Sequence, residues 1–363
     1  MPSEGAPAEQ RVEWLDSLRA LAALWVVAHH AASPGSFARS GFLGVQFGRL
    51  LAHGTLAVTA FIALSGFSLG LGAFRKGWRL RASYGEFLRA RSIRILPPYY
   101  FAILLTLAVT LLARRLLGEG LDATQAQTLG IALLKHLFLV QDLDATNLVD
   151  LPGWGDGVFW TIGVEFKIYL LFPLMLMAIR RGGLLMGAGS AALFALAFAA
   201  LPGLRLERKP GFIFVFFLGV AACAVAGRVS RRVALAGFAA ALAIGLACLQ
   251  TDPLAHQLPR DLAFGAGFCA LMACVEGLPR LQNALENRRL AGIGAFAYSL
   301  YLVHGIVLTL LGHAVPHGDG PLGALAFLVL TTIASLLAAR GFFVVAERPF
   351  FRARHRARET APT

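Results

Sequence analysis

Two residues of the first apolar segment, Arg19 and His30, are of types that can do chemistry inside a membrane. They lie eleven positions apart. At about 100° per residue, eleven steps bring a helix back to within about 20° of its starting direction, about 16 Å further along its axis. Arg19 and His30 therefore share one face of a helix, whereas His29 points about 80° away from it. A polar stripe is costly to keep in a bilayer and is typical of a functional interior.

A second pair of basic residues, Arg91 and Arg94, precedes Pro97, Pro98 and Tyr99. Residues three apart are neighbours on a helix, and two guanidinium groups suit a phosphate or a pyrophosphate. The alternative is ordinary anchoring of a helix end by positive charge, which is the more common role of a lone arginine pair. The two prolines favour the binding site, because we expect them to break the helix beside the arginines.

A carboxylate, Glu165, lies in a third apolar segment with Trp160 before it and Tyr169 one turn after it. If this segment runs from outside inward, Glu165 lies at a depth similar to that of His30. A histidine and a carboxylate that meet from two helices form a general base and the group that orients it. The alternative, equally weighted from these residues alone, is a structural ion pair with Arg19 or Lys167.

Further candidates are Tyr301 and His304, which share a helix face, and Ser65. Taken alone, His304 is more typical of a hydrogen-bonded core histidine than of a catalytic one. Ser65 precedes Gly66, and Ser-Gly in a membrane helix is more typical of close helix packing than of a nucleophile. We assign Trp160, Tyr169, Ser65, Tyr301 and His304 to a substrate pocket.

Composition excludes several classes of protein. Of the 363 residues, 57% are hydrophobic and 15% are charged, against about 25% charged in a soluble domain. The sequence therefore predicts an all-α integral membrane protein. The formal net charge of +13 is concentrated in short connections and at the C-terminal end, so we expect no nucleic acid partner. The four cysteines have no ligand-like spacing, and we expect no metal site and no bound cofactor.

The apolar segments predict a bundle of about ten transmembrane helices, at residues 15–33, 54–73, 96–117, 158–179, 183–202, 211–227, 233–250, 261–276, 292–312 and 322–345. Alternate connections are rich in arginine, which places both termini in the cytoplasm. We expect a cytoplasmic tail over 1–14, one transmembrane domain over 15–350 and a basic cytoplasmic tail over 351–363. The segment 124–140 is amphipathic and fits an interfacial or re-entrant helix.

Six blocks in one order resemble the membrane acyltransferase family 3, a family of O-acyltransferases that act on sugars and related acceptors. These blocks are Leu15 to His30 with its Arg-x10-His spacing, His53 to Phe67, Arg91-Ser-Ile-Arg-Ile-Leu-Pro-Pro-Tyr99, Trp160 to Pro173, Tyr298-Ser-Leu-Tyr-Leu-Val-His304 and Glu347-Arg-Pro349. The resemblance covers residues 15–350. Among the departures, Thr59 stands where the family motif has aspartate, and Thr161 and Ile168 also differ from it.

The resemblance implies transfer of an acyl group, by default acetyl, from acyl-CoA to a hydroxyl of a carbohydrate or of a glycosylated small molecule. It implies donor binding by Arg91, Arg94 and Tyr99. It implies catalysis by His30 as general base, by Glu165, which orients His30, and by Arg19, which bridges the donor and catalytic sites. It also implies a multi-pass protein of the bacterial inner membrane, with the lipid bilayer as a partner.

The competing hypothesis is a multi-pass transporter of a glycan, a lipid or a small metabolite. Intramembrane Arg, His and Glu residues and about ten spans also suit that class. The sequence lacks the inverted-repeat symmetry and the paired interrupted helices typical of many transporters, which favours the enzyme.

Overall fold

The computed structural model describes residues 12–32, 37, 41–80, 82–116, 118, 120–141, 157–200, 210–253, 256–315 and 320–350. Within these residues, all regular structure is helical. The α-helices are α1 (Glu13–Ala31), α2 (Gly41–Ala52), α3 (Gly54–Phe74), α4 (Tyr84–Leu116), α5 (Ala123–Leu137), α6 (Trp160–Ala200), α7 (Pro210–Ala222), α8 (Arg231–Leu249), α9 (Gln257–Cys274), α10 (Pro279–Leu285), α11 (Arg288–Gly294), α12 (Ala297–Ala314) and α13 (Pro321–Phe342). A π-helical turn, η5 (Phe343–Glu347), continues α13. The tail 351–363 and residues 1–11 of the other predicted tail lie outside the described residues.

The expected membrane helices are present. Seven described helices are long and apolar enough to cross a membrane: α3, α4, α6, α8, α9, α12 and α13. The predicted all-helical membrane protein is thus confirmed, and α5 covers most of the amphipathic segment 124–140. The count of ten spans and the cytoplasmic termini stay predictions. Helix α2 was not expected from the sequence.

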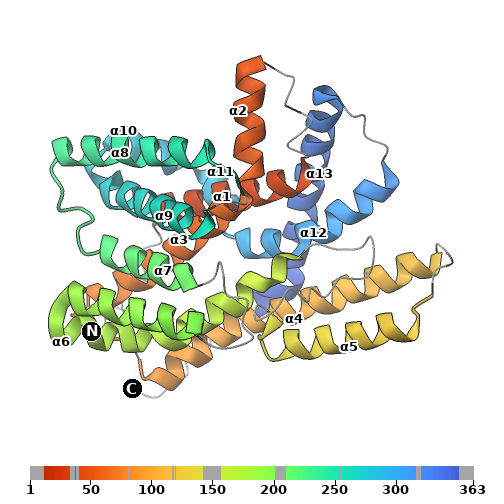
Figure 1. Ribbon diagram of the computed structural model, residues 1–363, viewed down its shortest axis with the longest axis horizontal. Coiled ribbons are helices and arrows are strands. Elements are labelled where there is room, and N and C mark those ends of the chain that lie inside the picture. Colours follow the sequence, from red (N-terminus) through yellow and green to blue (C-terminus); the bar gives the residue numbers. More distant parts are fainter. Residues whose placement is uncertain are drawn as a thin grey trace, which may run out of the picture.

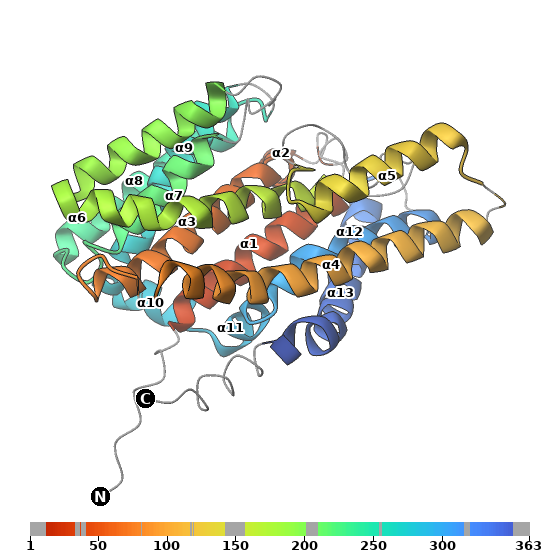
Figure 2. The same ribbon diagram turned by 90° about the horizontal axis from the view of Figure 1, so that it is seen from below.

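Helix α6 supplies two of the expected segments, 158–179 and 183–202, as one element. Its helical geometry is interrupted at Gly182 and Gly183, and Gly183 has a φ of 67°, which favours glycine. The element turns back on itself at this point (Figure 2). The expected boundary between the two segments therefore corresponds to a glycine turn.

Helix α4 runs unbroken for 33 residues through Pro97 and Pro98, so the prediction that these prolines break the helix is wrong. Proline has no backbone N–H, and each proline removes one bond to the carbonyl four residues earlier. The carbonyls concerned belong to Ile93 and Arg94, beside the arginine pair. The helix begins at a capping box, in which the Ser83 amide donates to Glu86 Oε2 (2.9 Å) and the Glu86 amide to Ser83 Oγ (3.3 Å).

Helix α1 lies in the middle of the molecule (Figure 2), where it packs against α3, α11, α12 and α13. Its buried residues include Trp14, Leu18, Val26 and Val27, which belong to the main hydrophobic core. Helices α2 and α13 stand beside each other at the top of Figure 1, while α4 and α5 extend to its right. The central position of α1 lets its polar face meet side chains from several other helices.

Helices α3 and α7 pack closely, and glycines permit this contact. A Cβ atom on Gly219 would collide with the backbone carbonyl of Ala63 and lie 2.9 Å from the amide nitrogen of Phe67. A Cβ on Gly66 would likewise collide with the carbonyl of Phe216. Small residues at helix crossings are the usual basis of close packing in membranes. This contact fixes α3, which carries Ser65 and Ser68.

We expect Gly219→Ala to destabilise the protein by about 1–3 kcal/mol, because the added methyl meets backbone atoms that cannot rotate away. The measurement is the midpoint of thermal unfolding of detergent-purified protein. Gly245→Ala in α8 is the matched control, since no atom lies within 4 Å of its added Cβ. Equal midpoints for the two variants would contradict the packing account.

Candidate active site

Arg19 is anchored from two sides in the centre of the bundle. Its guanidinium donates to Asp16 Oδ1 (2.5 Å) one turn earlier in α1 and to Ser68 Oγ (2.6 Å) of α3. The Ser68 hydroxyl in turn donates to the carbonyl of Leu64 (2.7 Å). About a quarter of the Arg19 side chain stays accessible. Arg19 is thus held in place while part of its side chain stays accessible.

The arginine pair of α4 lies close to Arg19. The guanidinium carbon of Arg91 lies 5.9 Å from the ring centre of Tyr169, and Tyr169 and Arg94 both act electrostatically on Arg19. Arg94 is exposed and, among the described residues, has no hydrogen-bonded or ion-paired partner. Three guanidinium groups from two helices therefore surround one region near Tyr169. Like charges this close favour an anion between them.

Glu165 belongs to this same cluster. The Tyr169 hydroxyl donates to Glu165 Oε1, the Ser65 hydroxyl lies 2.9 Å from the Tyr169 hydroxyl, and Ser65 Oγ lies 3.5 Å from Glu165 Oε1. Lys167 turns instead to the carbonyl of Leu139 (2.8 Å). The alternative of a structural ion pair with Arg19 or Lys167 is therefore not seen among the described residues. The carboxylate fixes a hydroxyl network next to the arginines.

His30 lies at the other end of the α1 stripe, among other histidines. Its ring centre is 4.7 Å from that of His29 and 5.4 Å from that of His304 in α12. Its side chain is exposed, as a base that receives a substrate must be. The hydrogen bonds of Glu165 go to Tyr169 and Ser65, so its role as the group that orients His30 stays a prediction.

The expected pocket residues divide between these two regions. Ser65 and Tyr169 lie with the arginines, whereas Tyr301 and His304 lie with His30, their ring centres being 5.8 Å apart. The Tyr301 hydroxyl donates to the carbonyl of Val158 (2.5 Å) and accepts from Thr161 Oγ1 (2.8 Å). These bonds join α12 to the start of α6.

Two aromatic rings are accessible around this second region. Phe61 of α3 lies 6.2 Å from Tyr301, ring centre to ring centre, and is half-buried. Trp160 is half-buried and stacks on Phe212, with ring centres 6.0 Å apart. Aromatic faces next to a candidate base suit an acceptor that is partly apolar.

Tyr99 packs against α5, and its assignment to the donor site stays a prediction. The residue is fully buried, and its hydroxyl donates to the carbonyl of His136 in α5 (3.3 Å). Its ring packs against Phe159 and Tyr100. Tyr99 thus holds α5 against α4.

Two polar clusters escaped the sequence analysis. Ser299 donates to Glu347 Oε2 (2.5 Å) in a buried pair between α12 and η5, and Arg94 acts electrostatically on this carboxylate. A short element with π-helical geometry offers no periodic signal from which such a pair could be inferred. Within the described residues, no three His, Cys, Asp or Glu side chains are grouped to hold a metal ion.

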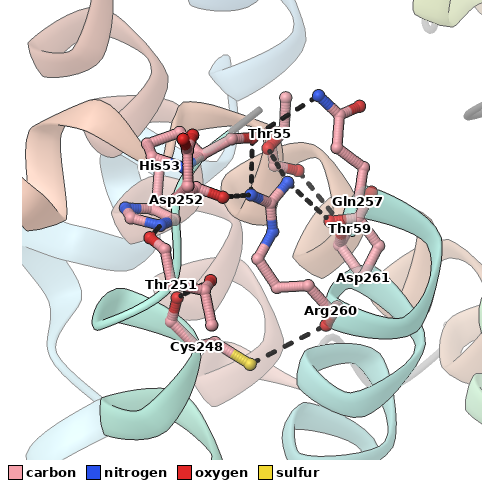
Figure 3. Close-up of polar contacts among 10 residues, drawn as sticks. His53, Thr55, Thr59, Cys248, Thr251, Asp252, Gln257, Arg260 and Asp261 are labelled. Atoms are coloured by element: carbon pink, nitrogen blue, oxygen red, sulfur yellow. Dashed lines mark hydrogen bonds and ion pairs between the residues drawn. The ribbon is translucent and has the colours of Figure 1, made fainter. Parts of the chain in front are cut away.

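The second missed cluster surrounds Arg260 at the start of α9 (Figure 3). Its buried guanidinium donates to the carbonyls of Pro253 (2.6 Å) and Asp252 (3.2 Å), to Thr55 Oγ1 (3.3 Å) and to Asp261 Oδ1 (3.3 Å). The arginine thereby fastens the connection between α8 and α9 to the beginning of α3.

The beginning of α3 also supports the histidines. The imidazole of His29 donates from Nδ1 to the carbonyl of Leu51 (2.5 Å) and lies against Gly54, where a Cβ would collide with the ring. His53 directs its two ring nitrogens at the carbonyls of Arg49 (2.7 Å) and Thr251 (3.1 Å). The Arg260 cluster therefore holds the backbone against which the C-terminal end of α1 packs.

Comparisons with known proteins agree with the motifs. A family model described as an acyltransferase domain matches residues 12–340. The chain is 26% identical to an acyltransferase of Streptomyces mycarofaciens, named MdmB, over 98% of this chain and 96% of that one. It is also 26% identical to the O-acetyltransferase PaAT-1 of Phomopsis amygdali, over 83% of this chain and 73% of that one. No solved structure matches the chain.

We expect Arg260→Met to lower the free energy of unfolding by about 3–5 kcal/mol, because Asp261 is left as a buried charge without its partner. Thermal unfolding in detergent measures the loss. Arg232→Met, at an exposed position of α8, is the control. The double variant Arg260→Met/Asp261→Asn should recover part of the stability. If it recovers none, the charge of Asp261 is not the cause of the loss.

Proposed function

The chain belongs to the membrane acyltransferase family 3, and from this premise we propose that it moves an acetyl group from acetyl-CoA to a hydroxyl of a carbohydrate or a glycosylated small molecule. The observation that carries the proposal is the meeting of Arg19, Arg91 and Arg94 around Tyr169, at the other end of α1 from the exposed His30. An anion site and a base on one continuous helix face suit a donor that carries phosphates at one end and the reactive acyl group at the other.

In this proposal the three arginines hold the phosphates of CoA. A guanidinium forms paired, charge-assisted hydrogen bonds with phosphate oxygens, and an anion relieves the repulsion between Arg19 and Arg94. The half-buried Ser65, whose hydroxyl bonds to Tyr169 and Glu165, would lie beside the path from the phosphates toward the outer end of α1. The distance along α1 from Arg19 to His30 is about 16 Å, which the pantetheine arm would have to cross.

His30 would act as general base. A neutral imidazole accepts the proton of the acceptor hydroxyl while the hydroxyl oxygen forms a bond to the acyl carbon. The bond between the acyl carbon and the sulfur then breaks. The proton held by His30 passes to the sulfur, and CoA leaves as the thiol.

The acceptor would lie against the accessible rings beside His30. Phe61 and Trp160 offer apolar faces, and the faces of sugar rings and of apolar ring systems both pack well on aromatic side chains. As a multi-pass protein of the bacterial inner membrane, the enzyme would receive the donor from the cytoplasm.

We expect His30→Ala to lower transfer from radiolabelled acetyl-CoA by at least about 10²-fold, the usual contribution of a general base. Membranes with wild-type or variant protein are supplied with candidate glycans and glycosylated metabolites, and CoA release and labelled product are both followed. CoA binding to the purified variant should equal that of the wild type, which shows that the fold is kept. Full transfer by His30→Ala would end the assignment of the base.

We expect Arg94→Ala to raise the KM for acetyl-CoA by about 10- to 100-fold, since charge-assisted bonds contribute about 1.5–3 kcal/mol each. The kcat should change much less, because the bonds are made equally in the ground and transition states. Arg89→Ala removes the same charge from an exposed position of the same helix and is the matched control. An unchanged KM would contradict donor binding by Arg94 and favour the alternative, in which its charge only anchors the helix end.

A further inference from the structure

The imidazole of His304 is fixed in one tautomer. Its Nδ1 lies 2.7 Å from the carbonyl oxygen of Tyr301 and 3.2 Å from that of Leu300. A carbonyl oxygen only accepts, so Nδ1 carries the proton and Nε2 carries the lone pair. Because both acceptors belong to the backbone of α12 itself, the ring cannot exchange its two nitrogens without losing them.

The lone pair at Nε2 has no protein partner. His304 is 0% exposed, and among the described residues no donor reaches its Nε2. The Tyr301 hydroxyl is not available, since it donates to Val158. A buried polar atom left without a hydrogen bond costs about 1–3 kcal/mol, so a purely structural histidine would be expected to have a partner here.

The ring beside this lone pair is that of His30. The two ring centres are 5.4 Å apart with 39° between the planes, a separation at which two ring nitrogens that point toward each other come to about hydrogen-bond distance. The histidines that act electrostatically on His30 are His304 and its neighbour His29, whose Nδ1 already donates to Leu51. Of the two, His304 is the one with a buried, preset acceptor.

We propose that His304 is the positioning residue of His30, and that its Nε2 accepts a hydrogen bond from the His30 ring during transfer. This inference rests on the proposed function and deepens it. The sequence analysis gave the orienting role to Glu165, whose hydrogen bonds go to Tyr169 and Ser65. A neutral acceptor suits the task in an apolar bundle, since it adds no second charge.

The hydrogen bond acts in two stages of the reaction. Before transfer, the N–H of neutral His30 donates to His304 Nε2, which leaves the other His30 nitrogen as the base. As the hydroxyl proton reaches that nitrogen, the imidazolium keeps its bond to His304 and is stabilised by it. The proton then leaves for the sulfur of CoA, so His304 neither gains nor loses a proton over the cycle.

The test compares three substitutions at position 304 in purified protein with acetyl-CoA and an accepted acceptor. His304→Phe removes the acceptor and should lower kcat by about 10- to 100-fold, as loss of a group that orients a catalytic side chain usually does. The KM for acetyl-CoA should stay within about twofold of the wild type. His304→Gln places an amide oxygen near the position of Nε2 and should restore kcat to within about fivefold.

His304→Asn serves as a third variant, because its shorter amide reaches only the position of Nδ1; it should lose kcat as His304→Phe does. It also replaces His304→Phe if that variant is not monodisperse. His313→Phe is the matched control, since His313 makes the same Nδ1 bond to the carbonyl four residues earlier, Thr309 (2.8 Å), but is exposed. Its kcat should equal that of the wild type.

A double variant separates positioning from packing. In a His30→Ala background, His304→Phe should cause no further loss of residual transfer, because two residues that act through one step are not additive. The proposal is overturned if the His304→Phe kcat stays within about twofold of the wild type. It is also overturned if Gln and Asn lose activity equally or if the losses add in the double variant. Absence of transfer by the wild type would contradict the proposed function, whereas wild-type transfer that needs His30 but not His304 would contradict this inference alone.

Discussion

The structure depends on a guanidinium that is held inside a helical bundle. Arg19 can stay there because Asp16 of its own helix and Ser68 of α3 accept hydrogen bonds from its guanidinium. A charge removed from water must be paired, so the pair fixes both the rotation of α1 and its height against α3. Once α1 is fixed at Arg19, the helix period determines where His30 emerges about three turns later. The candidate anion site and the candidate base are therefore positioned by one interaction.

Around this axis, the two regions use their polar groups differently. Near Arg19 the charges are dense, and the carboxylate of Glu165 acts through Tyr169 and Ser65. Near His30 the polar side chains of Tyr301, His304 and His29 bond to backbone carbonyls. The first arrangement suits recognition of a fixed negative charge, and the second suits a proton that moves briefly and returns.

The sequence was sufficient for features that depend on a single helix. The shared face of Arg19 and His30, the neighbouring Arg91 and Arg94 and the glycine-interrupted pair of segments in α6 all follow from spacing. The sequence was not sufficient to predict contacts that depend on how two helices are aligned against each other. Glu165 pairs with Tyr169 and Ser65 because of how α6 meets α3, and Tyr99 is buried because α5 folds back onto α4.

The conformation of the connections between helices could not be predicted from the sequence either. From the sequence, Arg260 could be an ordinary charge in a short connection. Nothing in the sequence indicated that the backbone carbonyls of residues 252 and 253 would accept hydrogen bonds from its guanidinium. Pro97 and Pro98 led to a wrong prediction of a helix break. Helix α4 continues through both prolines although each removes one backbone hydrogen bond.

The Arg260 cluster also bears on how the chain is made. Apart from Asp261, every acceptor of its guanidinium precedes it in the sequence, in α3 and in the connection after α8. When α9 leaves the ribosome, the groups that neutralise its arginine have already been synthesised. The order of synthesis thus lets this helix enter the lipid with its charge covered, provided that α3 and α8 have already docked.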